Sequence, residues 1–324
     1  HMRDHIEGAD LAIANMEFTL AGEPYSGYPC FSAPDTLADY LADCGFDIFL
    51  AANNHIFDKG AKGAERTLEI YRRLENERGI RFMGLAGDEE ELNQRNPLFI
   101  RSKGIKLALL NATYGTNMGL GAHWPKTNYL SARTQLESAL SKAKEADADV
   151  TIAFPHWGTE YVLKHSARQE ETAIWLAESG ADMIIGAHPH VIQDFQMLET
   201  SETNGYKKVP VAYSLGNAVS NMSARNTQLG LLAKISVVRL HNGDLKFLPI
   251  ELTYIWCSRP GGYNESYTVI PVKKFIDKRD RWIGSYDYDK MIDTYRHVKE
   301  KTGIKNLKVE PLSKQLNTNS SSNS

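Results

Sequence analysis

The sequence has no long apolar run and no block of like charge, and each absence excludes a class of protein. Its longest apolar stretches, such as 183–185 and 229–235, are far shorter than the roughly 20 residues of a membrane-spanning helix, so we expect no transmembrane segment. Lys and Arg number 37 against 40 Asp and Glu, for a net charge of −3. This balance argues against a nucleic-acid partner.

Cysteine is also scarce, and several catalytic motifs are missing. Cys30, Cys44 and Cys257 show no CxxC or Cys/His spacing, and an odd number cannot close into a full set of intrachain disulfides. The redox compartment therefore stays open. No P-loop, G-x-S-x-G or strand-linked G-x-G-x-x-G pattern occurs, so NTPase, serine hydrolase and dinucleotide-binding functions lack support.

What is present is an average globular composition, with 42% hydrophobic and 24% charged residues in 324. No Pro/Gly-rich linker divides the chain. We therefore expect one α/β domain over residues 1–260, an elaboration of the same domain over 261–315, and a disordered Asn/Ser-rich tail over 316–324.

Short apolar runs alternate with amphipathic segments through the first two-thirds of the chain. The predicted strands are 10–16, 46–52, 106–112, 150–154, 181–185 and 209–213, and the predicted helices are 34–44, 60–76, 131–145 and 168–179. This alternation indicates an α/β sheet.

The pattern changes after residue 229. Two alternating strands, 231–240 and 245–254, flank an Asn242-Gly243 turn and predict an antiparallel hairpin that covers or extends the sheet. A further strand over 263–270 and a helix over 287–302, ended by Gly303, are expected beyond it.

Polar residues of the kinds that bind metals follow four of the predicted strands. They are Asn15-Met16-Glu17, Asn53-Asn54-His55, His156-Trp157-Gly158 and His188-Pro189-His190. Because ligands collect beyond the carboxyl ends of strands in α/β sheets, we expect these segments to converge. Imidazole, carboxylate and amide groups together suit Zn, Mn or Fe, and one carboxylate can bridge two ions about 3.5–4 Å apart.

Each segment also has a structural explanation. Asn54 could cap the next helix, and Glu17 could be a solvated strand end. His188 and His190 alternate in a Pro-containing segment, which we expect to be extended with both imidazoles on one side. The structural explanations are credible singly and less so for all four segments together. For the remaining candidates we favour structural roles, namely His123, His165, His241 and His297.

Further polar residues flank these segments. We expect Tyr114, Asn117 and Asn217 to line a substrate pocket, with Arg225 binding a phosphate or carboxylate, although an ordinary surface role fits Arg225 equally well. Glu160 could orient a metal-bound histidine as a hydrogen-bond acceptor or form a surface ion pair.

Five blocks together resemble the CapA family of capsule and poly-γ-glutamate biosynthesis proteins, from about residue 8 to about residue 260. They are Asn15-Met16-Glu17, 51–55 with Asp58 and Gly60, 156–161, Gly186-Ala187-His188-Pro189-His190-Val191, and Tyr213-Ser214-Leu215-Gly216-Asn217. The family is similar to the calcineurin-like metallophosphoesterases. The resemblance therefore implies an αββα sandwich with two metals at strand ends, carrying the C-terminal hairpin as an addition.

The resemblance also implies roles for individual residues. Glu17 would bridge two metals and His55 would assist the leaving group or stabilise developing charge. The remaining metal ligands would be Asn54, His156, His188 and His190. The family's first strand, which ends in Gly-Asp, has no counterpart before Glu17. We therefore expect one metal position to be intact and the other to keep only Glu17 and His190.

These features predict a metal-dependent phosphoesterase-like hydrolase in capsule or poly-γ-glutamate synthesis, using divalent Mn, Zn or Fe. Its substrate would be a cell-surface polymer or a phosphate ester, and subunits of a membrane polymer synthase would be its partners. The resemblance implies an extracytoplasmic location, with any membrane anchor upstream of residue 1. A non-catalytic metal-binding accessory of the synthase is the alternative, and a two-metal amide or peptide hydrolase is a weaker one.

Overall fold

A computed structural model describes residues 1–121, 123–201, 206–243 and 245–304. Its helices are α1 (Arg3–Glu7), α2 (Asp35–Asp43), α3 (Gly60–Arg78), α4 (Glu89–Arg95), α5 (Arg133–Glu145), α6 (Ala167–Glu178), α7 (Val272–Phe275), α8 (Ser285–Thr302) and the 3₁₀ helix η2 (Arg279–Arg281). Its strands are β1 (Ile13–Asn15), β2 (Ile48–Leu50), β3 (Arg81–Met83), β4 (Leu98–Ser102), β5 (Ile105–Thr113), β6 (Val150–His156), β7 (Met183–Ile185), β8 (Phe195–Glu199), β9 (Lys208–Ala212), β10 (Leu229–Lys234), β11 (Val237–Arg239), β12 (Leu245–Phe247), β13 (Glu251–Ser258) and β14 (Thr268–Pro271).

Two sheets form the centre of the main body. One is the parallel sheet β1-β2-β3, and the other has six strands in the order β4-β5-β6-β7-β9-β8. Alternate residues of β2 point to opposite faces: Phe49 packs with the residues of α2 and α3, whereas Ile48 and Leu50 pack against the six-stranded sheet. The opposite face of that second sheet, which includes Leu110 and Ala153, packs against α5 and α6.

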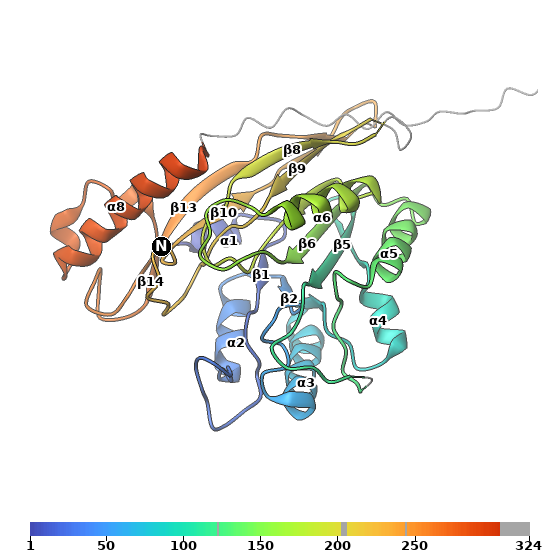
Figure 1. The fold of residues 1–324 in the computed structure, drawn as a ribbon, viewed down its shortest axis with the longest axis horizontal. Coiled ribbons are helices and arrows are strands. Elements are labelled where there is room, and N and C mark those ends of the chain that lie inside the picture. The colour runs from blue at the N-terminus through green and yellow to red at the C-terminus, as the bar shows by residue number, and fades with distance from the viewer. Residues whose placement is uncertain (122, 202–205, 244, 305–324) are drawn as a thin grey trace, which may run out of the picture.

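The order of layers is therefore helices, sheet, sheet, helices, which confirms the predicted αββα sandwich. In Figure 1, α2 and α3 lie at the bottom of this body and α6 lies near its top.

The predicted helices form where the apolar spacing places them. In α3, Leu68, Tyr71 and Leu74 lie on one buried face, and the helix ends at Gly79, whose φ of 72° is left-handed. Ser166 begins α6 with a capping box, accepting from the Gln169 backbone N–H while the Gln169 side chain accepts from the Ser166 backbone.

Several strands differ from the prediction. The strands expected over 10–16 and 46–52 are shorter in the structure. Only three residues of each are paired, in β1 and in β2, because the chain leaves the sheet before and after these residues. The segments of β3, β4, α4 and β8 were not predicted. At three residues, β3 is too short to show a period, and β4 returns into β5 through Lys103 and Gly104, both with positive φ.

The predicted C-terminal hairpin is confirmed, but its two strands are not continuous. β10 pairs with β13 so that Leu231 faces Tyr254, whereas β11 pairs with β12 so that Arg239 faces Leu245. The pairing register changes by one residue between the two ladders, and residues 235–236 and 248–250 interrupt the strands there. Leu245 packs with the core between the two main sheets, so this part of the hairpin covers the sandwich.

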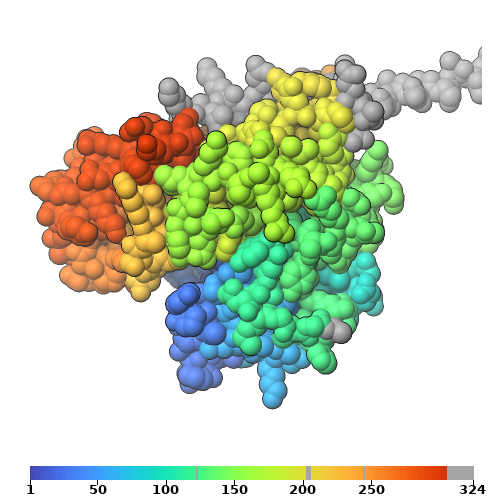
Figure 2. Space-filling view, in the orientation of Figure 1, coloured from blue at the N-terminus to red at the C-terminus, as the bar shows by residue number. Residues whose placement is uncertain are grey.

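The C-terminal segment adds to this hairpin. β14 pairs with β13, and α8 buries Met291 and Val298 against Trp256. The strand predicted over 263–270 was wrong in its first part, because turns precede β14. Figure 2 shows this part as a lobe beside the sandwich. Residues 305–324, which include the predicted tail 316–324, lie outside the described residues. The division into 1–260 and 261–315 stays a prediction.

Among the described residues, no helix combines the length and apolar character needed to cross a membrane.

Candidate metal centre

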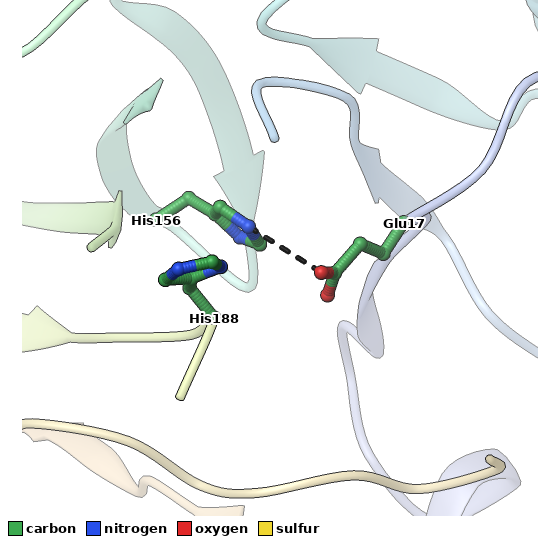
Figure 3. A group of neighbouring side chains, drawn as sticks. All are labelled: Glu17, His156 and His188. Atoms are coloured by element: carbon green, nitrogen blue, oxygen red, sulfur yellow. Dashed lines mark ion pairs between the residues drawn. The ribbon is translucent and has the colours of Figure 1, made fainter. Parts of the chain in front are cut away.

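Side chains from both sheets meet where β1, β2, β6 and β7 end. Glu17 follows β1, Asn54 follows β2, His156 is the last residue of β6, and His188 follows β7. His156 Nε2 lies 2.8 Å from Asn54 Oδ1 and 3.5 Å from Glu17 Oε1. Figure 3 shows the side chains of Glu17, His156 and His188 pointing toward one another. The predicted convergence of these segments is confirmed.

Asn53 ties the ends of β1 and β2 together. This buried side chain donates through Nδ2 to the Met16 carbonyl at 2.8 Å and accepts from the His55 backbone N–H at 3.0 Å. Glu17 follows Met16 and Asn54 follows Asn53, so these hydrogen bonds hold Glu17 and Asn54 next to each other. Local polar contacts thus position two candidate ligands that are 37 residues apart in the sequence.

The His188-Pro189-His190 segment has a different backbone from the extended one predicted. Both histidines have positive φ, 99° at His188 and 58° at His190, and this turning of the chain leaves their rings 5.9 Å apart. His190 Nε2 lies 3.6 Å from Glu17 Oε1, while its Nδ1 is held at 3.0 Å by Asn217 Oδ1. Left-handed backbone at two non-glycine residues that only one proline separates is strained, which is typical of functional sites.

The buried polar atoms of this cluster fit a divalent metal. Glu17 Oε1 and His188 Nδ1 are buried and have no hydrogen-bond partner among the described residues. A buried carboxylate oxygen without a donor is costly, and a cation would remove that cost. Glu17, His156 and His188 can bring their ligand atoms within 4.8 Å of one another, as can Glu160, His188 and His190. The mixed nitrogen and oxygen donors suit Zn, Mn or Fe.

The electrostatics place both types of ligand in the protonation state that metals require. Burial alone would raise the pKa of Glu17, but His156, His190 and His188 outweigh it and lower the pKa to about 2. Burial, together with the neighbouring imidazole of His156, lowers the pKa of His188 to about 3. At neutral pH Glu17 is therefore charged and His188 is neutral.

A pH dependence of stability follows for the metal-free protein. The pKa of His188 falls from 6.5 in its ordinary state to about 3 in the fold, so between these values the unfolded chain binds more protons. Stability therefore decreases as the pH falls, by about 2 kcal/mol between pH 7 and pH 5. Urea unfolding at the two pH values should show this loss, and His188→Gln should reduce it. An equal loss in His188→Gln would contradict the assignment, and His241→Gln is the control.

A second polar pair borders the cluster. His55 Nδ1 lies 2.7 Å from Asp58 Oδ2, and the Asn117 side-chain amide lies 3.1 Å from the same His55 nitrogen. Asp58 also accepts from the Phe31 backbone N–H at 2.8 Å, which fixes the carboxylate. Sequence reasoning gave Asp58 no role. The sequence did contain one indication of this contact, because Asp58 lies only three residues after His55, on the same turn.

The other predicted site residues divide into two groups. Tyr114 lies at the cluster, with its ring 4.7 Å from His188, and Asn117 and Asn217 contact His55 and His190. Arg225 lies apart, because it is exposed and lines a surface hollow with Tyr286, Asp289, Lys290 and other residues. Substrate binding by these four residues stays a prediction.

The structure thus defines a mixed α/β sandwich with a candidate divalent-metal centre between its sheets. The chain belongs to the family described as bacterial capsule synthesis protein PGA_cap, whose model matches residues 1–222. This confirms the predicted family.

Two curated relatives are similar over much of the chain. The capsule biosynthesis protein CapA of Bacillus anthracis is 29% identical over 262 residues, which cover 78% of this chain and 60% of the relative. The PGA biosynthesis protein CapA of Bacillus subtilis (strain 168) is 26% identical over 212 residues, which cover 65% and 52%. The matched part of the chain thus spans a little over half of each relative.

Solved structures show more distant likeness. A 5'-nucleotidase precursor from Thermus thermophilus is 13% identical with a TM-score of 0.48, over 92% of this chain and 52% of that one. The calcineurin-like phosphoesterase YfkN from Bacillus subtilis is 12% identical with a TM-score of 0.36, over 84% and 76%.

Proposed function

We propose that this chain is a metal-dependent phosphoesterase-like hydrolase that acts in the synthesis of a bacterial capsule polymer, for which the family resemblance implies poly-γ-glutamate. The observation that carries this proposal is Glu17 Oε1, a buried oxygen without a hydrogen-bond partner among the described residues, which lies 3.5 Å from His156 Nε2 and 3.6 Å from His190 Nε2. These separations are too long for hydrogen bonds. They match the spacing of about 3.4 Å between two ligands that share one ion.

The residues that would hold the metal ions are Glu17, Asn54, His156, His188 and His190. When bound, such ions neutralise developing charge on phosphoryl oxygens and lower the pKa of water. Neutral His188 and ionised Glu17 bind without first losing a proton, because of the pKa shifts in this cluster.

His55 would serve as the proton donor to the leaving group. Asp58 and Asn117 contact its Nδ1, so Nε2 is the nitrogen left to hand over a proton. The Asp58 carboxylate would accept from His55 Nδ1–H and fix the ring orientation. Asp58 is thus a positioning residue for His55.

The test is metal analysis followed by hydrolysis of an aryl phosphate by the purified chain with Mn²⁺ or Zn²⁺. We expect hydrolysis that a chelator abolishes and added metal restores. His188→Ala should lose metal and activity together, while His241→Ala, in the turn between β11 and β12, should keep both. Bound metal without hydrolysis of any phosphate ester would favour the non-catalytic accessory instead, and absence of binding would overturn the metal centre.

A narrower prediction concerns Asp58. Asp58→Asn should lower kcat on the aryl phosphate about 10- to 100-fold, because the ring of His55 loses its anionic partner. Metal content should stay unchanged, because Asp58 contacts His55 and not the ligand cluster. Asp43→Asn, which removes an exposed ion pair with Arg78, is the matched control.

We also propose that the protein works outside the cytoplasmic membrane, beside the subunits of a polymer synthase. Its membership in a capsule synthesis family supports this location. Cys30 is a free and partly exposed thiol, so it can report the location. A membrane-impermeant maleimide should label the protein in cells with an intact cytoplasmic membrane. Replacing both partly exposed thiols, Cys30→Ser and Cys44→Ser, should remove most of that label. Labelling only after membrane lysis would contradict the proposal.

A further inference from the structure

We propose that Glu160 is a carboxylate ligand of a second metal position, which it forms with His190 and Glu17 beside the position of Asn54 and His156. The inference rests on the metal centre of the proposed function and adds a ligand to it. From the sequence, we expected this second position to keep only Glu17 and His190. Glu160 would supply the third protein ligand that catalytic metal sites usually have.

The first support is the distance between the candidate ligand atoms. Glu160 Oε1 lies 3.9 Å from His190 Nε2, and Glu17 Oε1 lies 3.6 Å from the same nitrogen. Both separations exceed a hydrogen bond, and both approach the roughly 3.4 Å between two atoms that bind one tetrahedral ion. His190 Nε2 therefore faces two carboxylates and bonds to neither.

The second support is that another residue already orients His190. Its Nδ1 lies 3.0 Å from Asn217 Oδ1, which is the contact that sets the tautomer of a metal-binding imidazole. The orienting role that the sequence suggested for Glu160 is thus filled by Asn217. Glu160 lies at the opposite ring nitrogen, where a ligand of the same ion would lie.

The third support is the backbone, which holds Glu160 at this place. The Trp157 N–H donates to the Ala187 carbonyl at 3.0 Å, and the Tyr161 N–H donates to the Pro189 carbonyl at 2.8 Å. The segment 157–161 is thereby fixed along the His188-Pro189-His190 segment. Glu160 is consequently not a freely moving surface residue, although its side chain is partly exposed.

Backbone strain marks the same two segments. Among the described residues, six non-glycine residues have positive φ, and Tyr161, His188 and His190 are three of them. Strain of this kind persists only where the surrounding structure determines the conformation, and it concentrates at ligand sites.

The candidate ligands are too many for one ion, so we divide them between two metal positions. His188 belongs to both candidate groups, but its ring centroid lies closer to that of His156, at 4.9 Å, than to that of His190, at 5.9 Å, which favours the first position. The second position then has His190, Glu160 and the shared Glu17. Two carboxylates would partly neutralise two divalent ions, which limits the repulsion between them.

The test is the metal stoichiometry of the full chain, measured with Mn²⁺ by equilibrium dialysis and by the exchange-coupled spectrum of a two-manganese centre. The wild type should bind two equivalents and show the coupled spectrum. Glu160→Gln should keep one tight equivalent, weaken the other about 10- to 100-fold and lose the coupling. Glu171→Gln in α6, which removes an exposed ion pair with Arg133 of α5, should behave as the wild type.

The outcomes separate the two proposals. Two equal equivalents in Glu160→Gln, or a single equivalent in the wild type, would overturn the role of Glu160 and leave a metal-dependent function standing. A wild-type chain that binds no Mn²⁺ or Zn²⁺ would overturn both.

Discussion

Glu17→Gln is expected to reduce aryl phosphate hydrolysis about 10²- to 10³-fold and to weaken metal binding at both positions. Glu17 Oε1 faces both His156 and His190, so one substitution removes the charge that the two positions share. Glutamine has nearly the same shape and can still accept from Asn15 through its carbonyl oxygen. Folding stability should therefore change by about 1 kcal/mol or less.

The measurements are metal content after dialysis, kcat at saturating Mn²⁺, and urea unfolding of the metal-free protein. Glu171→Gln again controls for the loss of one surface carboxylate. If Glu17→Gln retained the metal content of the wild type, Glu17 would not be a ligand. If it lost activity because of unfolding, the urea curve would show this directly.

Gly84→Ala is expected to destabilise the fold by about 3–5 kcal/mol, the largest effect of a single methyl group that we predict. Gly84 follows β3 with a φ of 86°, and a Cβ there would lie 2.3 Å from Asn111 Oδ1 and 2.5 Å from the Ala52 backbone nitrogen. These two atoms form a 2.8 Å hydrogen bond between the two sheets. The methyl group would push the sheets apart just before Asn54, so metal affinity should also fall.

Gly104→Ala is the matched control for backbone strain alone. Gly104 has a φ of 78°, but a Cβ there meets no atom of the described part of the chain within 4 Å. Its substitution should cost only about 1 kcal/mol. If Gly84→Ala and Gly104→Ala lowered the free energy of unfolding by similar amounts, the close approach of Gly84 to Asn111 and Ala52 would not be needed for stability.

Elements with a clear period were predictable because their residues carry the information locally. The buried face of α3, with Leu68, Tyr71 and Leu74, repeats at helical spacing, and the Asn242-Gly243 turn predicts a hairpin by itself. β3 has only three residues and was missed, because its strand character comes from pairing with β2. The break between β10 and β11 was missed for the same reason, since a register change depends on the partner strand.

In the candidate site, too, some features could be predicted from the sequence and others could not. The residue types after the strands predicted the ligands Glu17, Asn54, His156, His188 and His190, because the chemistry of a metal ligand is a property of the side chain itself. The sequence could not show that Glu160 faces His190 or that Asp58 holds His55.

By itself, then, the sequence indicated the family and, through that resemblance, the αββα sandwich, together with five candidate metal ligands. Tertiary structure alone decided the left-handed backbone at His188 and His190, and the pairing of segment 157–161 with that turn. The physical reason is that these features depend on hydrogen bonds between residues about 30 positions apart, such as the bond from Tyr161 to Pro189. Contacts of this kind exist only after the sheets have packed, so no local pattern in the chain encodes them.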